Sequence, residues 1–581
     1  MEGGPAYDPL GPARDLERRL GDPTDPTVAF SFARIRHLDE REEFPEAICD
    51  GLTSWGLHEY FVPAQYGGRL HSYEQLLHLV RLVARRDLTA AIGYGKTFLG
   101  AVSAWIAATP EQCAGLAAKI LAGAPVSWAL TERDHGSDLL ASEVTATRLD
   151  QSYRLTGEKW LINNATRGRL LSVLARTDAA GGARGFGVLL VDKNDLPPGT
   201  LTCLPKVQTL GIRGADISGI AFTDAVVPDA AHLGPPGSGI EIVLKGLQLT
   251  RTMCASLALG ASEHALRIAM DWAAARQLYG RTLADLPMAW RLLLDAYTDQ
   301  LTAEAAAIVG SRLIHWNPEE LSVASAAVKY ALPVRSENTI AALGRLLGAR
   351  SILSGGDFQK VARDARIVSL FDGNTLVNLH AIVAQFPNLV RGYRRGRAYT
   401  DVTPAADVSR AVPPFERDRL KLFSRYGLGV VAALPDTAAV LAGLAETAPV
   451  LKRAAELAHT LAARTEQLHA SIAALPPARG GAPVVHLQRA KEFTECYLGA
   501  AAIALWLANH ARATTMDTGP LWEGGHWLTA VLRRVLTALG EPAPAEPDTD
   551  EILWTHLAAQ ASSGRMFSLF DCQLAEGVRG A

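Results

Sequence analysis

The sequence predicts a mostly helical protein with a central β-domain (α+β), and the change of hydrophobic period along the chain carries this prediction. Apolar residues recur at helical spacing through residues 1–122. Between residues 123 and 236 short runs alternate polar and apolar side chains, as strands do. The helical period returns at residues 237–398 and again at 415–581. We therefore expect four domains: helical, β, helical, and an extra C-terminal helical domain.

Short alternating runs place the strands of the β-domain. Residues 144–149 and 153–157 alternate polar and apolar side chains around a polar turn. Residues 171–177 and 187–191 flank a Gly-rich turn, which is typical of a hairpin. We expect six or more strands here.

Long periodic segments and breakers mark the helical domains. Residues 73–83 and 283–316 carry apolar side chains at helical spacing. A linker rich in Pro, Asp, Thr and Ala at 400–414 precedes the last domain. The longest apolar run, residues 497–508, would span about 18 Å as a helix, well short of a hydrocarbon core of about 30 Å. It predicts a buried helix and no membrane span.

Composition excludes several classes of protein. The 581 residues are 48% hydrophobic and 20% charged, and the net charge of −3 leaves no cationic excess for nucleic acid. The six cysteines lie far apart without a Cys-x-x-Cys pair, which argues against a zinc site and a disulfide framework. The N-terminus lacks the basic and apolar regions of a signal peptide. We expect a cytoplasmic protein without a bound metal.

Three segments suit cofactor binding, although each also has an ordinary structural explanation. Residues 128–138 run from an apolar strand into polar turn-forming residues, whose N–H groups and hydroxyls can bond a heteroaromatic ring or a pyrophosphate. Trp160, in the strand at 157–164, can lie against a planar cofactor or fill the core. Arg276, before Gly280, suits phosphate oxygens or simply marks a helix end.

Asp372 is the candidate general base. It follows an apolar run and precedes Gly373, and a carboxylate at the edge of an apolar surface is partly desolvated, which suits a base. The alternative is that Asp372 is the N-cap of the helix that begins after it. Spacing alone leaves both open.

Taken in order, these segments resemble the motifs of the acyl-CoA dehydrogenase family. Thr131 to Asp138 resembles T-E-P-x-x-G-S-D except at Arg133, and Gly157 to Trp160 resembles the start of G-x-K-x-W-I-[ST]-N. Further matches, between about Leu52 and Arg397, are Val62–Gly68 (V-P-x-x-Y-G-G), Leu210–Gly214 with Phe222–Pro228, Arg276–Gly280 (R-x-x-[FY]-G), and Arg363–Arg366 leading into Phe371-Asp372-Gly373.

The resemblance implies an FAD enzyme with an N-terminal helical domain, a β-barrel or sandwich, and a C-terminal four-helix bundle. A base would remove the α-proton of an acyl thioester while the β-hydrogen leaves as hydride to flavin N5. It implies Asp372 as the base, Arg251 near the active centre, and Ser137 and Gly373 as substrate contacts. The cofactor-binding residues that it implies are Trp128, Leu130, Thr131, Ser137, Trp160, Ile162, Arg276, Tyr279, Arg345 and Gly348.

Three departures from the family pattern bear on the chemistry. Asp372 stands where the common pattern has Glu and is one methylene shorter; Asp here also resembles the nitroalkane oxidase branch. Ile162 replaces a Ser or Thr whose hydroxyl usually bonds flavin N5. Arg345 and Ala349 replace the Gln and the last Gly of the family's flavin-contacting Q-x-x-G-G element.

The C-terminal extension resembles, in position and helical character, the extra domain of very-long-chain dehydrogenases and acyl-CoA oxidases, which implies a homodimer. Three hypotheses remain: dehydrogenation of an acyl-CoA or acyl carrier protein thioester, an oxidase or monooxygenase on the same scaffold, and a flavin-binding protein without turnover. Electron-transfer flavoprotein and oxygen are the candidate acceptors. Chain length, branching, carrier and pathway stay open.

Overall fold

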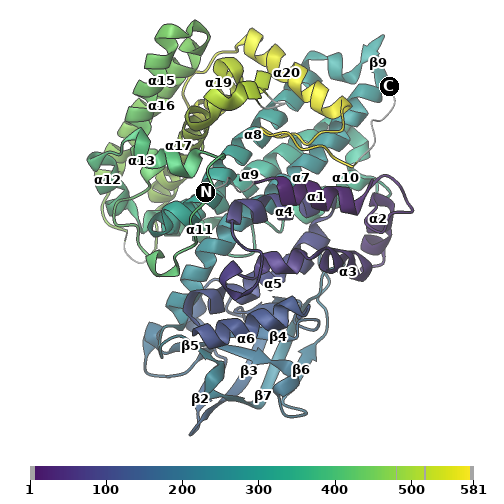
Figure 1. The fold of residues 1–581 in the computed structure, drawn as a ribbon, viewed down its shortest axis with the longest axis vertical. Helices are drawn as coiled ribbons and strands as arrows, with labels where there is room; N and C mark the ends of the chain where they lie inside the picture. The colour runs from purple at the N-terminus through teal and green to yellow at the C-terminus, as the bar shows by residue number, and fades with distance from the viewer. Residues whose placement is uncertain (1–6, 479–480, 516–518, 576–581) are drawn as a thin grey trace, which may run out of the picture. The chain divides into compact units, whose positions relative to one another are not determined.

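The computed structural model describes residues 7–478, 481–515 and 519–575, and the chain forms two compact units (Figure 1). The first unit contains the described residues up to Phe32, Ser72–Arg86, and the described residues from Arg251 onward. The second contains Ala33–His71 and Asp87–Thr250. Each unit therefore joins segments that are far apart in the sequence, and two helices, α2 (Phe32–Glu40) and α7 (Gly239–Ala275), cross the division between them.

The second unit contains an eight-stranded sheet, which confirms the predicted β-domain. Its order is β6-β7-β3-β2-β4-β5-β8, and β1 lies parallel to β4. The predicted hairpin is confirmed, because β4 and β5 pair antiparallel from Leu170 opposite Asp192 to Arg176 opposite Phe186. The strands are β1 (Val126–Ala129), β2 (Thr145–Arg148), β3 (Ser152–Asn163), β4 (Leu170–Arg176), β5 (Phe186–Asp192), β6 (Leu201–Leu204), β7 (Ile217–Pro228) and β8 (His232–Leu233).

Helices of the same unit begin at side chains that satisfy their first N–H groups. The Asp87 carboxylate accepts the N–H of Ala90 at 2.9 Å, at the start of α5. Thr109 and Gln112 form a capping box at the start of α6, with Pro110 at the first helical position. Strand β1 passes close to α5 at a glycine, Gly100. The helices are α3 (Glu46–Trp55), α5 (Leu88–Ala107) and α6 (Pro110–Leu121).

The first unit is helical (Figure 1); its C-terminal helix α17 packs against α8 and α9, and α19 packs against α8 and α17. This confirms the extra helical segment expected after residue 414. The predicted linker at 400–414 is wrong over its first half, which is the helix α13. The predicted apolar run lies inside α17 and is buried as expected. Its helices are α1 (Gly11–Leu20), α4 (Tyr73–Arg86), α8 (Pro287–Trp316), α9 (Leu321–Leu347), α10 (Asp357–Ala365), α11 (Thr375–Val383), α12 (Phe386–Arg395), α13 (Tyr399–Ala406), α14 (Gly429–Ala432), α15 (Leu434–Thr447), α16 (Lys452–Ala473), α17 (Val484–Asn509), α18 (Gly519–Trp522), α19 (His526–Ala538) and α20 (Pro547–Ser562), with a hairpin of β9 (Gln277–Leu278) and β10 (Arg281–Thr282).

Over the residues that the structure describes, no helix combines the length and the apolarity needed to cross a membrane. The same residues contain no cluster of three or more His, Cys, Asp or Glu side chains with the geometry of a metal site.

A buried ion network joins the C-terminal helices to the bundle. Arg335, on α9, donates to Asp299 of α8 and to Glu495 of α17, both at 2.7 Å. Arg534, on α19, also pairs with Asp299. Because breaking one partner of a buried pair leaves an uncompensated charge, this network favours one packing arrangement of the four helices.

Glu320, just before α9, makes stability depend on pH. Burial raises its pKa to about 7, although the N–H of Gly429 at 2.7 Å and the guanidinium of Arg397 oppose the rise. Because the folded chain holds this proton more tightly than the unfolded chain, the stabilisation is complete below about pH 4.5 and is lost as pH rises through about 7.

We therefore expect the Glu320→Gln variant to lose part of the pH dependence of unfolding. Relative to this variant, the wild-type free energy of unfolding should fall by about 2 kcal/mol between pH 5 and pH 8, which follows from about 1.4 kcal/mol per pKa unit. Urea unfolding of both proteins at the two pH values measures the difference. Parallel pH profiles would refute the assignment.

Candidate functional site

Asp372 lies in the tight turn that leads into α11, with its backbone in the left-handed region at φ 53°. The N-cap of α11 is Asn374, whose side chain accepts the N–H of Val377 at 3.0 Å. The alternative explanation of Asp372 as an N-cap is therefore wrong. Because a non-glycine residue adopts positive φ only when its surroundings impose it, the turn must be held by other groups.

Lys329 and Asn378 hold this turn through main-chain carbonyls. The buried ammonium of Lys329, on α9, donates to the carbonyls of Val368 at 2.7 Å and Gly373 at 3.2 Å. The Asn378 amide donates to the Gly373 carbonyl at 2.8 Å. Burial lowers the pKa of Lys329. These donors fix both ends of the segment that carries Asp372.

Arg251, on α7, holds the same turn from its other side. Its Nε donates to the main-chain carbonyl of Asp372 at 3.0 Å. Gly373 has φ +89°, and a Cβ at that position would lie 2.7 Å from an Arg251 nitrogen, so glycine permits this close approach. Burial lowers the pKa of Arg251, against the attraction of the Asp372 carboxylate. The predicted catalytic pair and Gly373 are thus brought together.

The Asp372 carboxylate is within reach of a thiol. The Sγ of Cys254, one helical turn after Arg251, lies 3.8 Å from Asp372 Oδ2. The sequence interpretation missed Cys254, Lys329 and Asn378. A lysine inside an otherwise apolar helix was the available signal for Lys329, and the three-residue spacing from Arg251 was the signal for Cys254.

In the second unit, the loop after β1 is bonded directly to β3. The hydroxyl of Thr131 donates to the Trp160 carbonyl at 2.8 Å, and the Trp160 N–H donates to the Thr131 carbonyl at 3.0 Å. Leu130 is buried, whereas Ser137 is exposed. The structure therefore brings Thr131 and Trp160 together, as a shared cofactor site requires.

A buried ion pair fixes the first part of this loop. Glu132 accepts Lys159 Nζ at 2.7 Å and the N–H groups of Glu143 at 2.6 Å and Val144 at 3.1 Å. Burial raises the pKa of Glu132, but these donors outweigh it, so the pKa lies below its ordinary value. Lys159 also donates to the Leu130 carbonyl at 2.9 Å. The loop is thus preorganised by protein groups.

Trp128 and Ile162 occupy different environments. The indole N–H of Trp128 is buried and has no acceptor within the described protein, so an acceptor on a bound cofactor would satisfy it. Ile162 is 2% exposed and packs in the core of the sheet, where it supplies no hydrogen bond. The residues around the loop therefore fit a planar group with acceptors, such as the flavin ring.

Arg133, at the family's proline position, lies over Trp160. Its guanidinium carbon is 4.6 Å from the Trp160 ring centroid, and it pairs with Glu158 at 3.0 Å. Because an exposed cation–π contact contributes about 0.5–1 kcal/mol, Arg133 holds the indole in place.

We expect the Arg133→Ala variant to bind FAD about threefold more weakly, since Trp160 loses this support. Titration of FAD into cofactor-free protein, followed by flavin fluorescence, measures the change. The matched control is Arg154→Ala, an exposed arginine of β3, the strand that carries Trp160, and this variant should bind FAD as the wild type does. Equal affinity in both variants would contradict the positioning role.

Four predicted cofactor residues lie exposed on the first unit. Tyr279 is 91% exposed at φ 54°, and Arg276 lies beside the Trp272 ring at 5.8 Å. Arg345 is exposed in the last turn of α9, and Gly348 is the exposed C-cap of that helix at φ +58°. Among the described residues, no buried side chain forms a hydrogen bond or an ion pair with these four.

Comparisons with known proteins match the central part of the chain to domains of one family. Residues 127–225 match the family model "Acyl-CoA dehydrogenase, middle domain", and residues 237–386 match "Acyl-CoA dehydrogenase, C-terminal domain". A probable acyl-CoA dehydrogenase of Mycobacterium tuberculosis, FadE25, is 27% identical over 345 residues, covering 58% of this chain and 87% of the relative.

Two solved structures share the fold. An acyl-CoA dehydrogenase of Bacillus anthracis complexed with FAD superposes with a TM-score of 0.67 at 17% identity, covering 96% of this chain and 97% of that one. The prolyl acyl carrier protein oxidase AnaB superposes with a TM-score of 0.59 at 17% identity, covering 65% and 99%. Residues 127–225 and 237–386 therefore match the middle and C-terminal domains of acyl-CoA dehydrogenases.

Proposed function

We propose that the protein is an FAD-dependent enzyme that dehydrogenates an acyl thioester between its α and β carbons, with Asp372 as the base. Members of the family are FAD-dependent oxidoreductases that act on CH–CH groups. The observation that carries the proposal is the turn of Asp372, whose main chain is held by Arg251 and whose neighbour Gly373 is held by Lys329 and Asn378.

This arrangement supports a general base because the main chain of Asp372 is held in place while its carboxylate stays available for reaction. Arg251 bonds the main-chain carbonyl of Asp372, so the side-chain carboxylate is left for substrate and for the weak donor Cys254. A base held in one position by its main chain can receive a proton without reorganising the site. Asp372 would take the α-proton of the thioester.

FAD, when bound, supplies the acceptor for the β-hydride. Thr131, Trp160 and the unsatisfied N–H of Trp128 would hold the flavin ring, and Glu132 with Lys159 fixes the loop that carries Thr131. Ser137 is exposed on the same loop and would contact the pantetheine arm of the substrate.

An oxidase is the second candidate, and Asn163 favours it. Counted from Gly157, the Ser or Thr position of G-x-K-x-W-I-[ST]-N falls on Asn163, whereas Ile162 matches the Ile of the pattern, so the assignment of Ile162 to the hydroxyl position is wrong. The hydroxyl that usually bonds flavin N5 is missing because Asn163 stands there. A prolyl acyl carrier protein oxidase has the same fold, so acyl carrier protein is a candidate carrier of the acyl group beside coenzyme A. Rapid reoxidation of reduced enzyme by air, with peroxide formed, would favour the oxidase over a dehydrogenase that uses electron-transfer flavoprotein.

The proposal includes a homodimer in the cytoplasm. Large apolar side chains stand exposed on the first unit, among them Tyr279 at 91%, Ile352 at 79% and Met288 at 74%. Exposed apolar side chains of this size are typical of a surface that another subunit covers. In a dimer, Arg276 would reach the FAD pyrophosphate of the second subunit. Sedimentation at micromolar concentration should give twice the mass of the chain.

The test is an anaerobic titration of the flavin absorbance with acyl thioesters. Short, long and branched acyl groups are presented both on coenzyme A and on carrier protein. Bleaching by one class establishes dehydrogenation and names the carrier. A flavin that binds but bleaches with none of them would leave the third hypothesis, a flavin-binding protein without turnover.

A further inference from the structure

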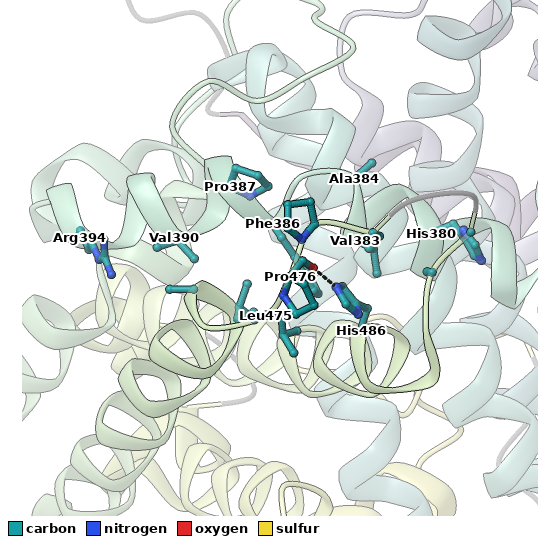
Figure 2. A pocket seen from close by; sticks show the side chains of 16 residues that line it. His380, Val383, Ala384, Phe386, Pro387, Val390, Arg394, Leu475, Pro476 and His486 are labelled. Carbon is teal, nitrogen blue, oxygen red and sulfur yellow. Dashed lines mark hydrogen bonds between the residues drawn. The ribbon is translucent and has the colours of Figure 1, made fainter.

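A cavity of about 590 Å³ lies between the helices that follow the catalytic turn and the C-terminal extension (Figure 2). One wall is formed by the end of α11 and by α12, and the other by the end of α16 and the start of α17. The family models end at residue 386, so the described residues of the second wall, which lie within 472–478 and 481–486, belong to the extension alone. The volume is in the range of small-molecule sites.

The lining of the cavity is apolar, and a basic side chain lies at each of its two ends. Figure 2 shows Val383, Phe386 and Val390 in a row between His380 at one end and Arg394 at the other. The described residues that line the cavity include no Asp or Glu. The cavity therefore offers a long apolar surface and a positive charge without a compensating negative one.

The basic groups have no acidic partner in the described protein. Neither Arg394 nor His380 takes part in an ion pair or a side-chain hydrogen bond there, whereas Arg397, three residues after Arg394, pairs with Glu320. An arginine at the rim of an apolar cavity is a natural partner for a carboxylate, because its planar fork binds both oxygens.

The inner wall of the cavity is formed by side chains held in fixed positions. His486 is 2% exposed, donates through Nε2 to the Pro476 carbonyl at 2.8 Å, and stacks on Phe386 with parallel rings 6.0 Å apart. Its other nitrogen, Nδ1, is buried and has no hydrogen-bond partner among the described residues. Because the carbonyl can only accept, Nε2 carries the hydrogen, and this bond fixes the ring as a flat wall of the cavity.

We propose that this cavity binds a free long-chain carboxylic acid, with the carboxylate on Arg394 and the chain along Val390, Phe386 and Val383. Charge complementarity selects an anionic head, and the apolar row selects an unbranched tail. The helix α11 links this cavity to the turn of Asp372: its end lines the cavity, and it begins at Thr375, three residues after Asp372. The site does not depend on which thioester the enzyme oxidises.

The test is binding of a fluorescent long-chain acid, cis-parinaric acid, to the FAD-loaded full chain, with palmitate as the competitor. Arg394→Ala removes the charge, and Ala384→Trp fills the cavity from an exposed position on its lining. Each should weaken binding about tenfold or more. The control is Arg391→Ala, on the same helix but outside the lining, which should leave binding unchanged.

Three results would overturn the proposal. The first is equal probe affinity in all three variants, with flavin absorbance and unfolding midpoints showing that each is folded. The second is palmityl alcohol competing as well as palmitate, which would remove the role of charge. The third is Arg394-dependent binding to vesicles of anionic phospholipid without binding of the free acid, which would make this a membrane contact. Failure to oxidise thioesters would leave the proposal untouched.

Discussion

The Asp372→Asn variant should lose at least about a thousandfold in kcat while it keeps its flavin. General bases contribute about 10²–10⁴-fold to a proton transfer, and the amide has the size of the carboxylate without its basicity. Arg251 should still hold the turn, because it bonds the main-chain carbonyl of residue 372 and not the side chain. Turnover of the thioester that bleaches the wild type, followed with an artificial electron acceptor, measures kcat.

A control separates the base from a general loss of negative charge. Asp418→Asn removes an exposed carboxylate of the same unit and should leave kcat unchanged. Flavin absorbance per chain should be equal in both variants and the wild type. If the Asp372→Asn enzyme kept more than a tenth of the wild-type kcat, another residue would have to be the base.

The Glu304→Ala variant should have the largest effect on stability. Glu304 is fully buried on α8, pairs with Arg81 of α4 at 2.6 Å, and accepts the N–H of Leu569 at 2.7 Å and the hydroxyl of Ser568. Removing it leaves a buried guanidinium whose remaining carboxylate, Glu263, is 3.6 Å away. We expect a loss of about 3 kcal/mol in the free energy of unfolding.

Urea unfolding of the first unit measures this loss, with Glu446→Ala as the control because Glu446 is exposed on α15. Limited proteolysis provides a second readout. The segment around Phe567 is held by Glu263, Glu304 and Arg81, so its cleavage should become faster in Glu304→Ala. A midpoint equal to that of the control would show that the segment is held by packing alone.

Much of the fold, and two pairs of neighbouring residues in the candidate site, could be predicted from the sequence. The change from helical to alternating period predicted the sheet and its β4–β5 hairpin, because side-chain periodicity is a local property of helices and strands. The ordered motifs predicted the family, and Thr131 with Trp160, and Arg251 with Asp372, lie together as the resemblance implies. The catalytic assignment itself stays a prediction.

Other features arise only from contacts between distant segments. Local spacing left Asp372 open as a helix cap, and the structure assigns that role to Asn374. Lys329 donates to the Val368 carbonyl, 39 residues away along the chain and just before the turn of Asp372, and this contact depends on how α9 packs. Arg133, read from the sequence only as a departure from a proline, lies over Trp160 because the loop folds back onto β3.

The sequence by itself determined the order of helical and β segments, the family motifs and the candidate base, because each depends on neighbouring residues or on a fixed spacing. The tertiary structure alone decided which groups hold the turn of Asp372 and how the C-terminal segment is anchored by buried Glu263 and Glu304. It also decided that the extension and α12 enclose an apolar cavity. The physical reason is that burial and charge pairing depend on which distant surfaces meet, and no local period encodes that.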